Sequence, residues 1–205
     1  MKVYEVLASG KPKDQRFEEY ASLVADDEVW DAIAPEGEAF KGIPLGREWT
    51  PRTFYFEKPL EPKSNFLYLC CDAFVCDERA RELAGEPLEM AGEFLPINIE
   101  KENGNYWIYN VTNCINAVDS ERSQWEKLGP DPEDRIMDKP AFIASRFGEE
   151  TIFKIPEDRV TSIYCVEFTG DPDDGEYKAT VEHHGLTGLL FELVWTDETD
   201  SNRCQ

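Results

Sequence analysis

The stretch at residues 93–112 constrains the fold of this chain more than any other. Two runs rich in β-branched and aromatic residues, 93–100 and 105–112, flank the pair Asn103-Gly104. Asn-Gly is the strongest short-range signal for a tight hairpin turn, and β-branched and aromatic side chains favour strands. The pattern therefore predicts a β-hairpin and, with it, an antiparallel sheet.

Further short segments predict the other elements. Single strands are expected at 3–7, 66–71, 162–168 and 189–195, and a second hairpin from 141–145 and 151–155. Asp77 is a candidate N-cap for a helix over 77–84 that stops at Gly85, and a helix over 176–184 is expected to stop at Gly185. The prediction is an α+β fold, with a largely antiparallel sheet built from hairpins and a few short helices packed against it.

The chain is expected to form a single domain. Its 205 residues are enough to bury a core without disulfide or metal support. Residues 40–65 are dense in Pro and Gly, which predicts irregular structure or edge strands. We therefore expect residues 1–65 to be an irregular or strand-like extension packed on a core at 66–195, and residues 196–205 to be a polar tail.

The charge balance restricts the partners. The chain has 21 basic and 43 acidic side chains and a net charge of −22. Such a chain is repelled by nucleic acid and by anionic membranes, so neither is expected as a direct partner. A cationic protein is the natural partner of this surface. The alternative is that the charge serves solubility alone.

The cysteines predict a reducing compartment. The chain has six, and the sequence starts without the pattern of a secretory signal peptide. We therefore expect reduced thiols in a cytoplasmic protein. Several cysteines lie in apolar runs, including Cys165, and core packing is the expected role there.

No catalytic or metal-binding motif is present. His183 and His184 are adjacent and point in different directions on a helix, so one site cannot easily use both. A pairing of Cys165 with either histidine lacks any activating sequence around it. The acidic run at 171–176 fails the spacing of a calcium loop. We expect no enzyme activity, cofactor or metal, although a small metal-dependent hydrolase with a carboxylate site assembled from scattered residues stays open.

Several segments of the second half resemble one bacterial family. They span residues 66–195 and occur in a consistent order: Asp77-Glu78-Arg79-Ala80, Phe94-Leu95-Pro96-Ile97, Tyr106-Trp107-Ile108-Tyr109-Asn110-Val111, Asn116-Ala117-Val118-Asp119, Ile152-Phe153-Lys154-Ile155 and Gly185-Leu186-Thr187-Gly188-Leu189-Leu190-Phe191. Together they resemble polymorphic-toxin immunity protein family eleven, in which Ser often stands at the position of Asp77. The order and spacing of the segments carry the resemblance.

The resemblance implies a cytoplasmic antidote without catalytic residues of its own. Such a protein binds the toxin encoded beside it, often a nuclease, and blocks the active site. The alternatives are an acidic adaptor or a DNA mimic. A nuclease holds phosphates in a basic cleft, so an acidic surface can occupy that cleft. The most acid-dense loop-like stretches are the expected contacts: Asp26, Asp27, Glu28 and Asp31; Asp131, Glu133 and Asp134; and Asp171, Asp173, Asp174 and Glu176.

Overall fold

The computed structural model describes residues 1–8, 23–34, 40–56, 64–70, 73–129, 135–158 and 162–197. Within these ranges lie three α-helices, twelve strands and three short 3-10 turns. The α-helices are α1 Asp27–Ile33, α2 Glu78–Ala91 and α3 Tyr177–His183, and the 3-10 turns are η3 Ala144–Arg146, η4 Pro156–Asp158 and η5 Pro172–Asp174. The strands are β1 Lys2–Ala8, β2 Leu23–Val24, β3 Arg52–Phe56, β4 Phe66–Cys70, β5 Ala73–Asp77, β6 Gly92–Ile99, β7 Tyr106–Val111, β8 Gln124–Lys127, β9 Arg135–Lys139, β10 Ile152–Phe153, β11 Ile163–Glu167 and β12 Leu189–Thr196.

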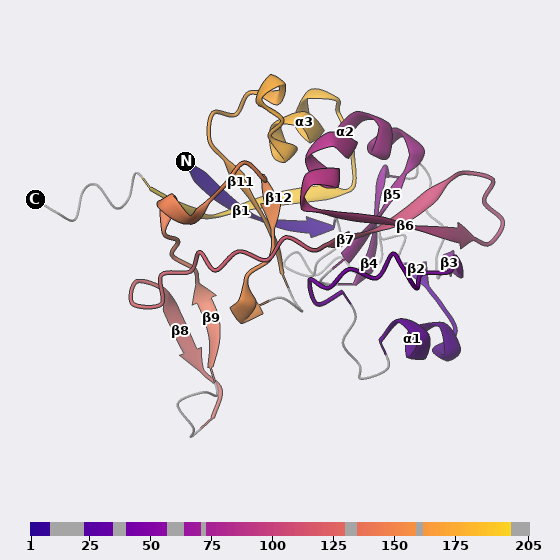
Figure 1. Ribbon diagram of the computed structural model, residues 1–205, viewed down its shortest axis with the longest axis horizontal. Coiled ribbons are helices and arrows are strands. Elements are labelled where there is room, and N and C mark those ends of the chain that lie inside the picture. Colours follow the sequence, from indigo (N-terminus) through magenta and orange to yellow (C-terminus); the bar gives the residue numbers. More distant parts are fainter. Residues whose placement is uncertain are drawn as a thin grey trace, which may run out of the picture.

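The strands form two main sheets and one small hairpin (Figure 1). The first sheet has the order β10-β11-β1-β12 and is antiparallel throughout. The second has the order β2-β3-β6-β7-β5-β4, in which the β3–β6 pair alone is parallel. β8 and β9 form the hairpin, which extends away from the body. The described residues thus form an α+β fold that is mostly antiparallel sheet, as the sequence predicts.

One helical layer covers both main sheets. Ala80, Ala84 and Leu88 of α2 and Val181 of α3 are buried in one apolar cluster together with residues of both sheets. The second sheet contributes side chains such as Phe74 and Tyr109, and the first contributes others such as Val6, Ile163 and Cys165. The sheets meet where the N–H of Phe66 in β4 donates to the carbonyl of Thr187, just before β12 (3.0 Å). The two helices therefore lie over the junction of the sheets.

Strand alternation places a different cover on the opposite faces. Val75, Leu95 and Ile108 point away from α2 and form a second cluster with Ile33 of α1. On the first sheet, Val3 and Val166 point into a third cluster, which includes Phe142. Figure 1 shows α2 and α3 at the upper edge of the molecule and α1 at the lower edge, with the sheets between.

Several sequence predictions are confirmed. β6 and β7 form the predicted hairpin, with Leu95 opposite Ile108. Strands occur at the predicted positions near residues 3–7, 66–71, 162–168 and 189–195. The helix expected over 176–184 is α3, and Gly185 follows it with a φ of 59°. Asp77 caps α2 by accepting a hydrogen bond from the N–H of Ala80 (2.7 Å).

Other sequence predictions are wrong. α2 does not stop at Gly85 but continues through Pro87 to Ala91. The hairpin expected from 141–145 and 151–155 does not form, because β10 pairs with β11 and residues 144–146 form η3. The turn between β6 and β7 spans residues 100–105, and Lys101 rather than Gly104 adopts the left-handed conformation, with a φ of 65°.

Residues 1–65 contribute to both sheets. β1 lies between β11 and β12, and β3 lies between β2 and β6. Both strands have hydrogen-bonded neighbours from the region 66–195. The boundary expected at residue 65 therefore does not separate an extension from a core.

Candidate protein-binding groove

The acidic stretch at 171–176 forms a loop that is held from inside. Glu176 is 2% exposed. Its carboxylate accepts hydrogen bonds from the N–H groups of Phe168 (3.0 Å), Thr169 (2.7 Å) and Gly170 (2.9 Å), and from the Thr169 hydroxyl (3.1 Å). The expected role of Glu176 as a surface contact is therefore wrong, because its oxygens are taken up within the loop.

The three aspartates of the same stretch stay on the surface. Asp171, Asp173 and Asp174 are exposed around η5. Asp171 caps this turn by accepting from the N–H of Asp173 (2.9 Å), and Asp174 accepts from the Thr169 hydroxyl (2.8 Å). The loop therefore presents its carboxylates on a fixed backbone.

This loop is one wall of an open groove of about 740 Å³. The other walls are the C-terminal half of α2 and the segment that precedes β10. The lining includes two large apolar side chains, Met90 and Phe168, here termed the apolar floor, which are 53% and 42% exposed. The lining residues are Glu86, Pro87, Met90, Gly148, Glu149, Thr151, Phe168, Thr169, Pro172, Asp173, Asp174, Gly175 and Glu176.

The described lining of the groove carries negative charge. None of the described residues that line it is basic. Lys178 of α3 is engaged by Glu167 (3.1 Å) and Glu182 (2.9 Å), and the Arg81 guanidinium of α2 stacks over the ring of Trp107 (4.4 Å). The walls therefore set up a negative potential over an apolar floor.

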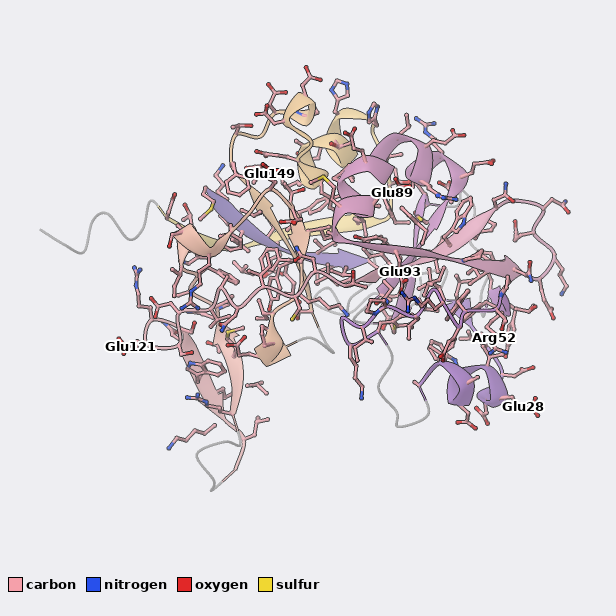
Figure 2. All side chains as sticks on the ribbon, viewed as in Figure 1. Glu28, Arg52, Glu89, Glu93, Glu121 and Glu149 are labelled. Carbon is pink, nitrogen blue, oxygen red and sulfur yellow. The ribbon has the colours of Figure 1, made fainter. Side chains whose placement is uncertain are left out.

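The acidic surface continues along α2. A second shallow depression shares Glu86 and Met90 with the groove and is lined further by Arg81, Glu82, Gly85 and Glu89. Residues 82, 86 and 89 are spaced by four and three, so they lie on one face of the helix. All three are exposed. Figure 2 shows Glu89 on α2, and Glu149 on the segment beside it.

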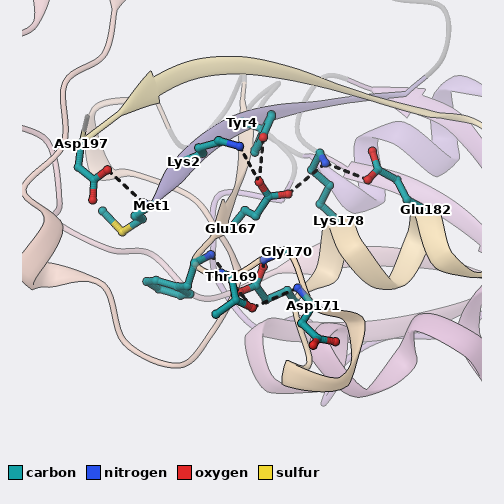
Figure 3. A network of polar contacts seen from close by, with 12 residues as sticks. Met1, Lys2, Tyr4, Glu167, Thr169, Gly170, Asp171, Lys178, Glu182 and Asp197 are labelled. Carbon is teal, nitrogen blue, oxygen red and sulfur yellow. Dashed lines mark hydrogen bonds and ion pairs between the residues drawn. The ribbon is translucent and has the colours of Figure 1, made fainter. Parts of the chain in front are cut away.

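A polar network fixes α3 and the start of the acidic loop against the first sheet (Figure 3). The Glu167 carboxylate of β11 accepts hydrogen bonds from Lys178 (3.1 Å) and from the Tyr4 hydroxyl (3.0 Å). Burial opposes the ionisation of Glu167, but the bonds from Lys178 and Tyr4 outweigh it and lower its pKa. Burial and the bond to Glu167 raise the pKa of Tyr4 to about 12.

The other predicted contact residues lie elsewhere. Asp26, Asp27, Glu28 and Asp31 are exposed at α1, which covers the opposite face of the second sheet. Figure 2 shows Glu28 at the lower edge of the molecule, far from Glu89. Asp131, Glu133 and Asp134 lie outside the described residues. The two predicted stretches that the structure describes therefore lie on different sides of the molecule.

The described cysteines and histidines are not part of the groove lining. Cys76 and Cys165 are fully buried, and burial raises the pKa of each thiol, in agreement with the expected packing role of Cys165. The rings of His183 and His184 contact each other edge to face (4.9 Å between centroids). Across the described residues, no group of three or more His, Cys, Asp or Glu side chains is arranged to hold a metal ion. No helix in these ranges is long and apolar enough to cross a membrane.

The sequence predicts only Asp173, Asp174 and Glu176 among the lining residues, and it does not predict the charged or large apolar side chains Glu86, Met90, Glu149 and Phe168. A helix that stops at Gly85 places Glu86 and Met90 in an unstructured connection. Had the apolar spacing of Ala80, Ala84 and Leu88 been followed past Gly85, it would have put both residues on a helix surface. No local signal marks Glu149 or Phe168, because their proximity arises from the tertiary fold.

Comparison with known proteins adds no assignment: no protein-family model matches the chain, and no curated protein matches its sequence. The resemblance to the immunity family therefore stays a prediction.

Proposed function

We propose that this protein is an immunity protein, the cytoplasmic antidote of a secreted bacterial toxin. It binds the toxin domain and covers its active site, so that the producing cell survives. In this proposal the chain is a stoichiometric inhibitor and has no catalytic activity.

One observation carries the proposal: a groove with an apolar floor and acidic walls, in which none of the described lining residues is basic. Interfaces combine an apolar centre with charge complementary to the partner. The net charge of −22 extends the same preference over the whole molecule. A nuclease toxin fits this surface, because the cleft that holds its phosphate substrate must be basic.

Coexpression tests the proposal. The chain is produced in cells together with the toxin domain encoded beside its gene, and survival is compared with cells that produce the toxin alone. We expect survival, and we expect the two proteins to copurify as a complex of fixed stoichiometry. A toxin variant with an inactivated active site is used as a control, because it does not kill the cells and copurification can then be measured whether or not the chain protects them. Failure both to protect the cells and to copurify would overturn the proposal.

A further inference from the structure

The floor of the groove is an exposed apolar surface in an otherwise highly charged molecule. Met90 comes from the last turn of α2 and Phe168 from the residue after β11, so two separate elements bring them together. Both are about half exposed, at 53% and 42%. Other large apolar side chains, such as Leu128 and Leu190, are equally exposed, so exposure alone does not mark a binding surface. Met90 and Phe168 differ in that they line the same groove.

The walls restrict the charge of the occupant. Glu86, Glu149 and Asp173 are exposed and make no hydrogen bond or ion pair through their carboxylates with any other described residue. Three acidic side chains on three separate segments therefore surround the floor without compensation. An anionic occupant is repelled, and a second copy of this chain would bring its own acidic surface to the same place.

The wall formed by residues 168–176 is preorganised by hydrogen bonds within the loop. The Glu176 carboxylate ties down three successive backbone N–H groups, and Asp171 caps η5. A rigid wall loses little conformational freedom on binding, so more of the contact energy is available to hold the partner.

We infer that this groove binds a segment of a partner protein that carries arginine beside an apolar residue. The apolar residue and the aliphatic part of the arginine lie on Met90 and Phe168. The guanidinium donates to the carboxylates of Glu86, Glu149 and Asp173. Arginine suits the site better than lysine, because its planar head donates two parallel hydrogen bonds to a carboxylate. A groove of about 740 Å³ is large enough for a few side chains.

This inference rests on the proposed function, since it names the part of the toxin that the antidote holds. The first test uses a defined probe: a fluorescein-labelled octapeptide of alternating arginine and leucine, with binding followed by fluorescence anisotropy. In the matched peptide citrulline, a neutral isostere, replaces arginine. We expect the citrulline peptide to bind at least about tenfold more weakly. Equal binding of both peptides would overturn the inference.

Two sets of variants locate the binding site. The groove triple variant, Glu86→Gln/Glu149→Gln/Asp173→Asn, is expected to bind the arginine peptide at least about tenfold more weakly. The control, Asp27→Asn/Glu28→Gln/Asp31→Asn on α1, removes the same number of charges on the opposite side and is expected to change binding less than about twofold. An equal loss in both triple variants would indicate attraction by net charge alone and would overturn the inference.

The floor is tested separately, because charge removal does not probe it. Phe168→Ala and Met90→Ala are each expected to weaken binding about fivefold, whereas Ile136→Ala on β9, also an exposed apolar residue, leaves it unchanged. Circular dichroism confirms that each variant is folded. If neither floor variant weakens binding, the inference is overturned. Displacement of the peptide by spermine at a similar concentration would point to a small polycation as the occupant and would equally overturn it.

The toxin protection assay separates the two proposals. If the wild-type protein protects cells and the groove triple variant protects equally well, the inference is overturned and the proposed function stands. If the wild-type protein neither protects cells nor copurifies with the toxin while the peptide binds in the groove, the proposed function is overturned and the preference of the groove for arginine segments stands. We expect protection by the wild-type protein and by the α1 triple variant, and loss of protection in the groove triple variant.

Discussion

At the scale of single residues, two carboxylates organise loops rather than face a partner. Glu176 holds residues 168–170 through their backbone N–H groups. Glu93 of β6 does the same elsewhere, accepting hydrogen bonds from the N–H groups of Leu45 (2.6 Å) and Gly46 (3.0 Å) and from the Asn110 amide (2.8 Å). Composition alone cannot tell a carboxylate that accepts hydrogen bonds from a loop from one that faces solvent. The two kinds differ only in which backbone N–H groups surround the side chain.

Replacement of Glu176 by glutamine tests its structural role. Glutamine has nearly the same size as glutamate but carries no charge. Its side-chain NH2 group replaces one acceptor oxygen and cannot accept a hydrogen bond from the backbone N–H groups of the loop. We expect the free energy of unfolding to fall by about 2 kcal/mol, since hydrogen bonds to a charged group contribute about 1.5–3 kcal/mol. Urea denaturation measures the change. Glu86→Gln is the control, because an exposed side chain without partners is expected to shift the value by less than about 0.5 kcal/mol. Similar values for both variants would contradict the role of Glu176.

The Glu167 network predicts a specific pH dependence. Because the folded-state pKa of Glu167 lies below its ordinary value of 4.5, its contribution to stability is present above that pH and is lost as the pH falls through the folded-state pKa. Glu167→Gln is therefore expected to be about 1–2 kcal/mol less stable than the wild-type protein at pH 7, with a smaller difference at pH 3.

Urea titrations at several pH values measure this difference. Glu182→Gln is the control, because Glu182 also pairs with Lys178 but its side chain is 58% exposed. We expect this substitution to change the free energy of unfolding by less than about 0.5 kcal/mol. A difference between Glu167→Gln and wild type that stays constant from pH 7 to pH 3 would show that the charge of Glu167 contributes nothing.

At the scale of elements, α2 shows how tertiary packing overrides a local stop signal. Gly85 has no left-handed φ, so it does not serve as the end of the helix. Ala80, Ala84, Leu88 and Ala91 follow a helical spacing and are all buried in the same cluster. Burial of this stripe stabilises the helix beyond both Gly85 and Pro87, each of which alone disfavours a helix.

Substitution by alanine is expected to have opposite effects on stability at Gly85 and at Gly188. A Cβ at Gly85 would have no neighbouring atom within 4 Å, so Gly85→Ala removes backbone freedom from the unfolded chain and is expected to stabilise the protein by about 0.5–1 kcal/mol. A Cβ at Gly188 would collide with the Phe66 carbonyl oxygen, and the φ of 104° disfavours any side chain. We expect Gly188→Ala to destabilise by more than about 2 kcal/mol. Thermal unfolding of both variants checks the signs, and a lower melting temperature for Gly85→Ala would contradict this account of α2.

Elements whose signals are local were predictable from sequence, and pairings between distant strands were not. The β6–β7 hairpin and the α3 stop at Gly185 depend on residues that are close in the chain. β10 pairs with β11, with Phe153 opposite Tyr164. Local sequence patterns do not show which distant strand a segment pairs with. No strand was predicted at β2, β5, β8 or β9. The groove was predictable in part, since Asp171, Asp173 and Asp174 lie in its wall or next to it, while the partners from α2 depend on the sheet beneath them.

At the scale of the whole molecule, the first strand ties distant parts of the chain together. β1 pairs with β11 on one side and with β12 on the other. Tyr4 and Val6 belong to the cluster beneath α2 and α3, whereas Val3 belongs to the cluster on the opposite face of the same sheet. The sheet that supports α3 and the acidic loop therefore depends on residues 2–8.

Deletion of residues 1–8 is expected to prevent folding of the remaining chain. Loss of β1 leaves β11 and β12 without their shared neighbour and exposes buried side chains of two clusters, a cost comparable to the roughly 5–15 kcal/mol by which domains are typically stable. We expect the deleted chain to lose the cooperative thermal transition of the full chain, as measured by near-ultraviolet circular dichroism. The control is Lys2→Ala, which keeps the strand and removes one exposed ion pair to Glu167. A cooperative transition in the deleted chain, or in a fragment spanning residues 66–195, would show that the later region folds as an independent core and that β1 merely adds to it.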